Sequence, residues 1–440
     1  MSVNYNIPCL ARVTAATVTT ATFAKPFVPF YLIGSTVIFA ATSALGVALV
    51  AIDWRPIYDM ARKVADVLVI LAAFYGLVIV NFLVLSRPAV SATHLVGILA
   101  LHSLFMIFGF AAARALKAVL FVLLSAAAIY SIVIVHYAAR FGDLMRDGYL
   151  HDVFGVGEPA VSITFHQNIG MMLGLAALAA LGLGSSRIKR IIAIGALPLV
   201  LLFMFYIAAR GALVALVCSL AFLVGASVWV RSKKLALLAV ITIILAVTLA
   251  SGLLYQRALQ DKEVDPKASD AISRTIREIQ DPRPGFRIQI LARTWDRISN
   301  EPNRLLFGRG IGMFPVNEGF GAPDWLLRKT EGARHYPHNV HLEILYETGI
   351  VGLLLFSILA FLPIGLSLKR WHSFSPAEKA AVSLYVFNLV SSELSGAFAF
   401  SYDFQFFFAL AVGIIARKRM NGVAVADMPP SGQARLLSAG

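Results

Sequence analysis

The chain has 440 residues, of which 59% are hydrophobic and only 14% are charged, and its formal net charge is +14. Soluble domains are typically about 45–50% apolar and about 25% charged, so this composition excludes an ordinary soluble globular protein. We assign the positive charge to cytoplasmic loops and to contacts with anionic lipid head groups rather than to nucleic acid. Cys9 and Cys218 lie far apart and predict neither a disulfide nor a thiolate metal site.

Apolar runs recur along the chain at about the length of 20 residues that crosses a hydrocarbon core about 30 Å thick. They fall at 27–52, 64–85, 94–113, 115–138, 161–184, 190–208, 211–230, 235–255, 340–366, 378–394 and 400–416. Arg12 and Lys25 precede the first run and favour a cytoplasmic start, so we interpret 27–52 as a hairpin broken near Thr42-Ser43. The fold class predicted is an all-α polytopic membrane protein with about 12 transmembrane helices, or about 11 if that run is one helix.

Basic connections set the orientation of these helices. If the runs alternate, one side of the membrane receives the clusters 185–190, 231–234, 369–370 and 417–419, and the positive-inside rule makes that side the cytoplasm. The polar segments 139–160 and 257–339 then face outward. We therefore expect an N-terminal transmembrane bundle at 1–256, a large outer loop at 257–339, C-terminal transmembrane helices at 340–418 and a cytoplasmic tail at 419–440.

The large outer loop has a pattern of its own. Residues 268–280 are compatible with a helix, and 286–298 predict an amphipathic helix with Phe286, Ile290 and Trp295 on its apolar side. Three glycines follow, which predict a flexible turn; they are Gly308, Gly310 and Gly312.

Three histidines lie at 335–341, where the outer loop meets an apolar run. Pro337 favours extended geometry before it and predicts a helix from about His338, so that His338 and His341 can share a face. Imidazole titrates near neutral pH, which makes His338 a candidate general base, with Asn339 or a backbone carbonyl fixing its tautomer. The alternatives are a solvated helix entrance or a zinc site. We expect no metal, because His335 lies before the proline, off the shared face, and no thiolate or carboxylate ligand spacing is present.

Arginines form the second group of candidates. Arg210 stands between two apolar runs without a polar loop, a costly place for a charge that indicates either a polar cavity or a snorkelling side chain. Other arginines that could jointly bind a phosphate group, although each can also be a solvated charge, are Arg140, Arg146, Arg287, Arg293 and Arg297. The carboxylates considered for an ion pair or for orienting a sugar are Glu343, Glu347, Glu393 and Asp403.

Three stretches resemble the bacterial O-antigen ligase family, within the superfamily of ligases, polymerases and O-linked oligosaccharyltransferases. The first is Arg210-Gly211 at the start of an apolar helix. The second is Gly285-Phe286-Arg287 in the large loop, followed by Gly308-Arg309-Gly310. The third is 338–349, which is similar to the family's His-Asn … Leu … Glu-x-Gly signature. In topology the resemblance covers nearly the whole chain.

The resemblance implies a glycosyltransferase of GT-C-like architecture in the inner membrane of a Gram-negative bacterium, with its active site and large loop facing the periplasm. It implies an undecaprenyl-pyrophosphate-linked O-antigen donor, a lipid A–core acceptor, and no metal or other cofactor. By similarity, Arg210 and Arg287 would hold the pyrophosphate and His338 would activate the acceptor hydroxyl, with inversion at the anomeric carbon. Residues in supporting roles would be Asn339, Arg140, Arg146, Arg293, Glu343 and His341.

Other functions share much of this pattern. An O-antigen polymerase and a protein O-oligosaccharyltransferase would use the same donor with another acceptor. A transporter of lipid-linked sugars should instead show inverted repeats and broken or charged helices at the bilayer midplane. The polar candidates gather at one membrane face and in one loop, which favours an enzyme.

Overall fold

The computed structural model of the chain describes residues 7–23, 35–87, 89–141, 145–146, 149–150, 159–184, 186–206, 209–230, 232–234, 256, 286–318 and 337–426. Its regular structure is helical apart from one short ribbon, in which β1 (Met145–Arg146) pairs antiparallel with β2 (Tyr149–Leu150). The predicted all-α class is therefore confirmed for the described part of the chain. The predicted helix at 268–280 and His335 lie outside it.

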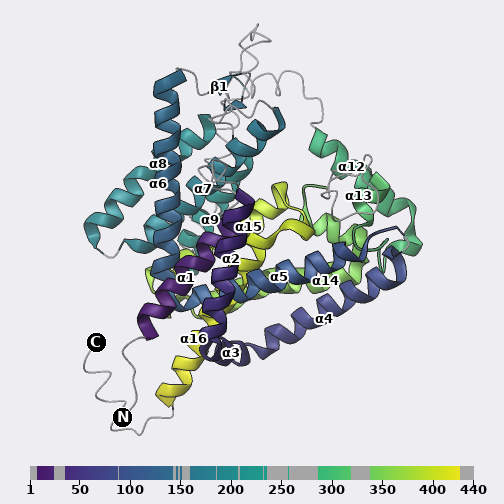
Figure 1. Cartoon of the computed structure of the whole chain (residues 1–440), viewed down its shortest axis with the longest axis horizontal. Helices are drawn as coiled ribbons and strands as arrows, with labels where there is room; N and C mark the ends of the chain where they lie inside the picture. The colour runs from purple at the N-terminus through teal and green to yellow at the C-terminus, as the bar shows by residue number, and fades with distance from the viewer. Residues whose placement is uncertain are drawn as a thin grey trace.

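The helices are arranged as shown in Figure 1. They are α1 (Ile7–Phe23), α2 (Ser35–Ile52), α3 (Trp54–Arg62), α4 (Ala65–Asn81), α5 (Ala92–Ala112), α6 (Leu116–Phe141), α7 (Pro159–Leu183), α8 (Arg187–Tyr206), α9 (Arg210–Trp229), α12 (Phe286–Asn300), α13 (Met313–Glu318), α14 (Val340–Lys369), α15 (Pro376–Ser395) and α16 (Tyr402–Ala426). Shorter helical turns are η2 (Phe82–Ser86), η3 (Ala113–Ala115), η4 (Pro302–Arg304), η6 (Trp371–Ser373) and η7 (Phe398–Phe400). The predicted apolar runs coincide with these helices where the structure describes them, but 235–255 and the first part of the run 27–52, residues 27–34, lie outside the described residues.

The core is built around α15 and α16, which pack against α5, α7 and α9. Residues Phe406 to Val412 of α16 are almost fully buried. A β-carbon on Gly109 of α5 would fall on the Phe406 carbonyl, so the missing side chain permits this close approach. Both C-terminal helices are thus enclosed by other helices, which lets α15 carry polar residues such as Ser383 and Asn388.

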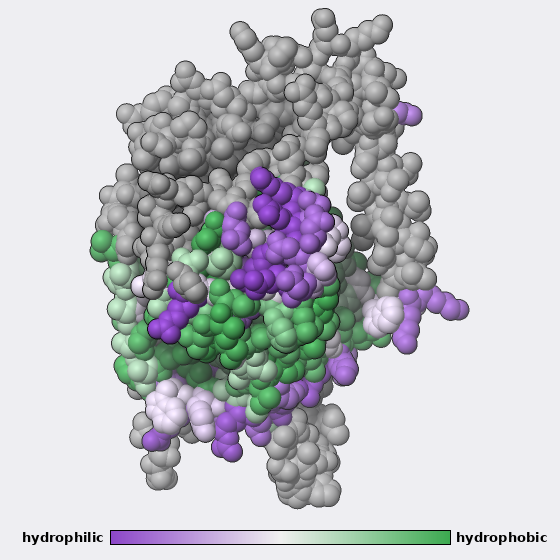
Figure 2. Space-filling model, turned by 90° about the vertical axis from the view of Figure 1, so that its right-hand side faces the viewer, coloured by the Kyte–Doolittle hydropathy of each residue, from purple (hydrophilic) through white to green (hydrophobic). Residues whose placement is uncertain are grey.

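Several helices are suited to a membrane. Among the described residues, five are long and apolar enough to cross one: Ala65–Ser86, Ala92–Ile132, Arg187–Phe205, Arg210–Trp229 and Val340–Lys369. On α8, large apolar side chains such as Leu199 (68% exposed) and Leu202 (65% exposed) point outward, which suits lipid and not water. Figure 2 shows a hydrophobic band between two hydrophilic areas. The chain is a multi-pass membrane protein, and the total of about 12 spans stays a prediction.

The hairpin predicted near Thr42-Ser43 is wrong. α2 runs through both residues. The Thr42 hydroxyl donates to the Ile38 carbonyl (2.6 Å) inside the same helix, so this polar side chain does not require a turn. The chain bends about three turns later, by 75° between Val37–Ile52 and Trp54–Arg62. Asp53 lies at this bend and pairs with Arg114 of η3. If the bent pair counts as one span, the described residues contain six candidate spans.

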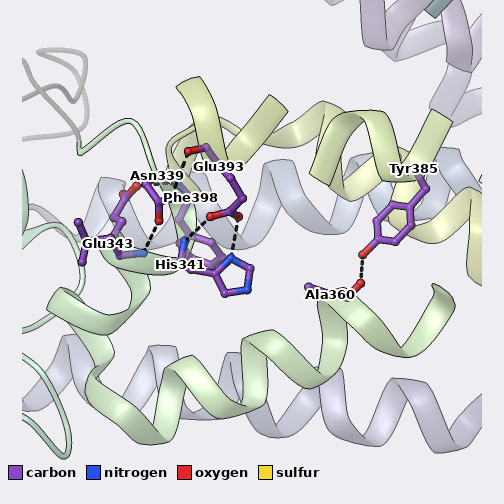
Figure 3. A network of polar contacts seen from close by, with 8 residues as sticks. Asn339, His341, Glu343, Ala360, Tyr385, Glu393 and Phe398 are labelled. Atoms are coloured by element: carbon purple, nitrogen blue, oxygen red, sulfur yellow. Dashed lines mark hydrogen bonds and ion pairs between the residues drawn. The ribbon is translucent and has the colours of Figure 1, made fainter. Parts of the chain in front are cut away.

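The long helix α14 is sharply bent at Gly349, whose φ is 70° and ψ is −169°. His341 before the bend lies 5.0 Å from the ring of Phe356 after it, measured between ring centroids. In a straight helix these residues would be about 22 Å apart, at 1.5 Å per residue. The second half of α14 therefore turns back beneath the first, as Figure 3 shows. This bend gives the beginning of α14 its own surroundings, apart from the membrane-spanning half.

Candidate active site

The beginning of α14 carries the candidate base. Helix geometry starts at Val340, two residues later than the predicted start, and Asn339 caps it by accepting the Leu342 N–H at its Oδ1 atom (2.7 Å). His338 precedes the cap with a φ of 58°, in the left-handed region. The shared helical face predicted for His338 and His341 is therefore wrong. A left-handed conformation costs an ordinary residue about 1–2 kcal/mol, so neighbouring contacts must hold it.

Glu393, near the end of α15, receives two side chains from this turn (Figure 3). Asn339 Nδ2 donates to the Glu393 backbone carbonyl (3.1 Å), and His341 Nδ1 lies 2.6 Å from the Glu393 carboxylate. We call Glu393, Asn339 and His341 together the Glu393 bridge. Glu393 thus contacts a histidine side chain, whereas the sequence analysis considered an ion pair or a sugar contact for it.

Arg210 lies at the same end of α15. It is the first residue of α9, half-buried, after the buried Ala209, and no polar loop separates it from α8. A β-carbon on Gly211 would stand 3.9 Å from the Cβ of Leu394, the residue after Glu393. The start of α9 and the start of α14 therefore meet the same end of α15, although their sequences are more than 100 residues apart (positions 210 and 338).

The large loop is docked onto the bend of α14 by residues 305–312, which we call the anchor turn. Its backbone pairs with α14 through Arg309 N–H to the Tyr346 carbonyl (3.0 Å) and Gly310 N–H to the Glu347 carbonyl (2.9 Å). In return, Ile350 N–H donates to the Leu305 carbonyl (2.9 Å). The predicted glycine turn exists, and its residues 308–312 are buried and hydrogen-bonded, so it is not the flexible turn that we expected.

Two glycines make this docking possible. Gly308 and Gly349 both have positive φ, 75° and 70°. A β-carbon on Gly308 would fall on the Glu347 carbonyl, and one on Gly349 would fall on the Leu306 carbonyl. At each glycine, the backbone of the other segment thus occupies the place where a side chain would begin. From the membrane side, Asn81 at the end of α4 donates to the Phe307 carbonyl (2.6 Å) and accepts the Ile311 N–H (2.9 Å).

Helix α12 of the loop is amphipathic as predicted, but Trp295, which we expected on the apolar side with Ile290, is 60% exposed and faces away from it. Ile290 and Ile298 are buried and form a small apolar cluster with Phe314 of α13 and Tyr346 of α14. The guanidinium of Arg309 lies 4.6 Å from the Tyr346 ring centroid and donates to the Arg297 carbonyl (2.6 Å). The arginine of the Gly308-Arg309-Gly310 motif therefore ties the loop to α14.

The other carboxylates bind backbone groups. Glu343 accepts the Phe398 N–H of η7 (2.9 Å), and Glu347 accepts the Phe314 N–H of α13 (3.1 Å). Both are buried, with 5% and 2% of their surface exposed. These two carboxylates thus hold η7 and α13 against α14, a role that the sequence pattern did not indicate. Asp403 lies in the first turn of α16.

The remaining arginines lie in elements around this region. Arg293 is exposed on α12, and Arg287 lies in the first turn of that helix. Arg140 lies near the end of α6, and Arg146 lies in β1. In the described ranges there is no group of three His, Cys, Asp or Glu residues arranged to hold a metal ion.

Residues 195–357 match the family model described as O-Antigen ligase. The matched segment contains Arg210, Arg287 and His338 and ends just after the bend of α14. A comparison with curated proteins finds no match to the chain.

Proposed function

We propose that the chain transfers an O-antigen glycan from undecaprenyl pyrophosphate to a sugar hydroxyl of lipid A–core, because its residues 195–357 match the O-antigen ligase family model. The family match supports the coarser part of this proposal, an enzyme of the ligase or polymerase type that takes a lipid-linked sugar donor in a membrane. The proposal adds the acceptor, a site on the periplasmic face of the inner membrane, the residue roles and a metal-independent mechanism.

One observation carries this proposal: the Arg210 end of α9 and the His338 turn of α14 meet at the same end of α15. A pyrophosphate donor needs positive charge beside its phosphates, and the acceptor hydroxyl needs a base close to the sugar carbon that is attacked. In our proposal, the guanidinium of Arg210 and the imidazole of His338, carried by helix starts at the same end of α15, meet these two requirements. The loop helix α12 begins at Phe286, has Arg287 as its second residue, and is docked on α14 through Ile290, Ile298 and Tyr346.

The transfer that we propose is a single displacement. His338 takes the proton of the acceptor hydroxyl while that oxygen attacks the anomeric carbon of the donor glycan. The bond between this carbon and the phosphate oxygen breaks, and its electron pair leaves with undecaprenyl pyrophosphate. Attack from the opposite side inverts the anomeric configuration. Arg210 and Arg287 neutralise the leaving group, which needs no proton at neutral pH.

The experiment is transfer by the purified full-length protein in lipid vesicles, with undecaprenyl-pyrophosphate-linked O-antigen and purified lipid A–core. Loss of general-base catalysis costs about 100-fold to 10,000-fold, so His338→Ala should fall by that factor. His372→Ala is the matched control, because His372 is exposed in η6 at the far end of α14. It should transfer like the wild type.

The products distinguish the alternatives. Glycan appearing on lipid A–core supports the ligase, whereas a longer lipid-linked glycan without that product identifies a polymerase. Glycosylation of an added protein acceptor identifies an oligosaccharyltransferase. Movement of intact donor across the vesicle membrane without transfer identifies a transporter. Wild-type rates in His338→Ala would show that His338 is not the base.

A further inference from the structure

The turn that carries His338 has an unusual backbone. Among the described residues, His338 is the one non-glycine residue with a positive φ. Such a conformation persists only where the surrounding structure holds it in place. On the C-terminal side, Asn339 and His341 supply that hold, and both of their side chains end on Glu393 of α15.

His341 is oriented mainly by Glu393. Its Nδ1 atom lies 2.6 Å from the Glu393 Oε1, and its ring packs edge-on against Phe356. Within the described part of the chain, the buried Nε2 atom makes no hydrogen bond. The carboxylate is therefore the polar group that fixes this ring, and through the ring it fixes the first turn of α14.

Asn339 joins the same residue by another route. Its Oδ1 caps α14 at Leu342, and its Nδ2 donates to the Glu393 backbone carbonyl (3.1 Å). Further along the first turn of α14, the Glu343 carboxylate accepts the Phe398 N–H (2.9 Å) of the segment that follows α15. The start of α14 is thus tied to the end of α15 and to the segment after it, through the Asn339 cap and through two residues of the first helical turn.

We propose that Glu393 is a positioning residue, which sets the place and direction of the His338 side chain through Asn339 and His341. This inference rests on the proposed function for the importance of His338, but not for the geometry. Moving a reacting group by about 1 Å can cost about 100-fold in rate, so a lost bridge should affect turnover more than donor affinity.

Kinetics of two substitutions give the first test. Glu393→Ala should lower kcat about tenfold to 100-fold, while KM for the lipid-linked donor changes less than about threefold. Glu393→Gln keeps an oxygen that can accept the His341 Nδ1–H, so it should recover most of the lost rate. The matched control is Glu378→Ala, because Glu378 lies at the other end of α15 and pairs with Lys418 (3.1 Å). Glu378→Ala should keep the wild-type kcat.

A second readout does not depend on transfer. In full-length protein labelled at its nine histidines, side-chain NMR signals are assigned with His338→Gln and His341→Gln. Glu393→Ala should shift or split the His338 signal, Glu393→Gln should return it close to the wild-type position, and Glu378→Ala should leave it unchanged. Absence of transfer in the wild type would refute the proposed function, while the His338 signal would still decide the positioning role.

A His338 signal unmoved by Glu393→Ala would refute the inference. So would a wild-type kcat per folded molecule in that variant, even with a lower thermal midpoint, because Glu393 would then stabilise the fold without positioning His338.

Discussion

Asn81 should hold the large loop in place from the membrane side. It is buried, with 4% of its surface exposed, and serves one backbone carbonyl and one backbone N–H of the anchor turn. Asn81→Leu keeps a similar volume but leaves Phe307 O and Ile311 N–H without this partner. Each buried backbone group that loses its partner costs about 1–3 kcal/mol, so opening of the anchor turn should become easier by at least about 2 kcal/mol.

Amide hydrogen exchange on the full-length protein in lipid nanodiscs measures this change. The amides of Arg309 and Gly310 are informative, because both donate to α14 carbonyls across the docking interface. A loss of about 2 kcal/mol corresponds to at least about thirtyfold faster exchange when the turn opens locally. Transfer activity is not needed for this measurement.

A matched control is available on α15. Asn388 is equally buried (1% exposed), but its amide nitrogen donates to the Leu384 carbonyl of its own helix (3.0 Å). Asn388→Leu should therefore leave exchange at Arg309 and Gly310 unchanged. The reasoning is refuted if Asn81→Leu leaves these rates unchanged, or if Asn388→Leu accelerates them equally.

Three further outcomes follow from the same geometry. Gly349→Ala should destabilise the protein by at least about 1–2 kcal/mol, because φ is 70° and the new methyl group meets the Leu306 backbone. A thermal midpoint no lower than that of Gly365→Ala, whose added carbon meets nothing within 4 Å, would contradict this. Arg210→Ala and Arg287→Ala should each weaken donor use about tenfold to 100-fold at normal expression, whereas the exposed Arg187→Ala should not; a wild-type KM for the donor argues against the phosphate role. EDTA should leave transfer unchanged, and its loss with recovery on adding Mg²⁺ would show that a metal takes part.

Much of the helical framework could be predicted because hydrocarbon-length apolar runs leave a strong sequence signal. The exceptions have physical causes. The helix α1 was not predicted, since it contains many threonines and has no long apolar run. Thr19 and Thr22 are nevertheless buried, because their hydroxyls donate to carbonyls one turn earlier (2.6 and 2.8 Å). The bend at Asp53 was placed too early for a similar reason, because Thr42 satisfies its hydroxyl within α2.

The candidate site was only partly predictable. His338 stood out because a titratable cluster meets an apolar run, and Arg210 stood out because a charge between apolar runs is costly. The pairing of His341 with Glu393 spans 52 positions and depends on how α14 and α15 pack, so no local pattern encodes it. The same applies to Asn81, which reaches residues more than 200 positions away (226 to Phe307).

The close backbone approach at Gly308 and Gly349 also limits which segments of this protein can be replaced by those of a relative. A loop taken from a relative and joined at residue 339 would bring its own residue to position 308 while the bend at 349 stayed behind. Any side chain at either place would meet the main chain of the other segment. A chimera should therefore exchange the stretch through Val351 as one unit, because Val351 still donates to the Leu306 carbonyl (3.3 Å). Loop and bend therefore form a single structural unit in any such chimera.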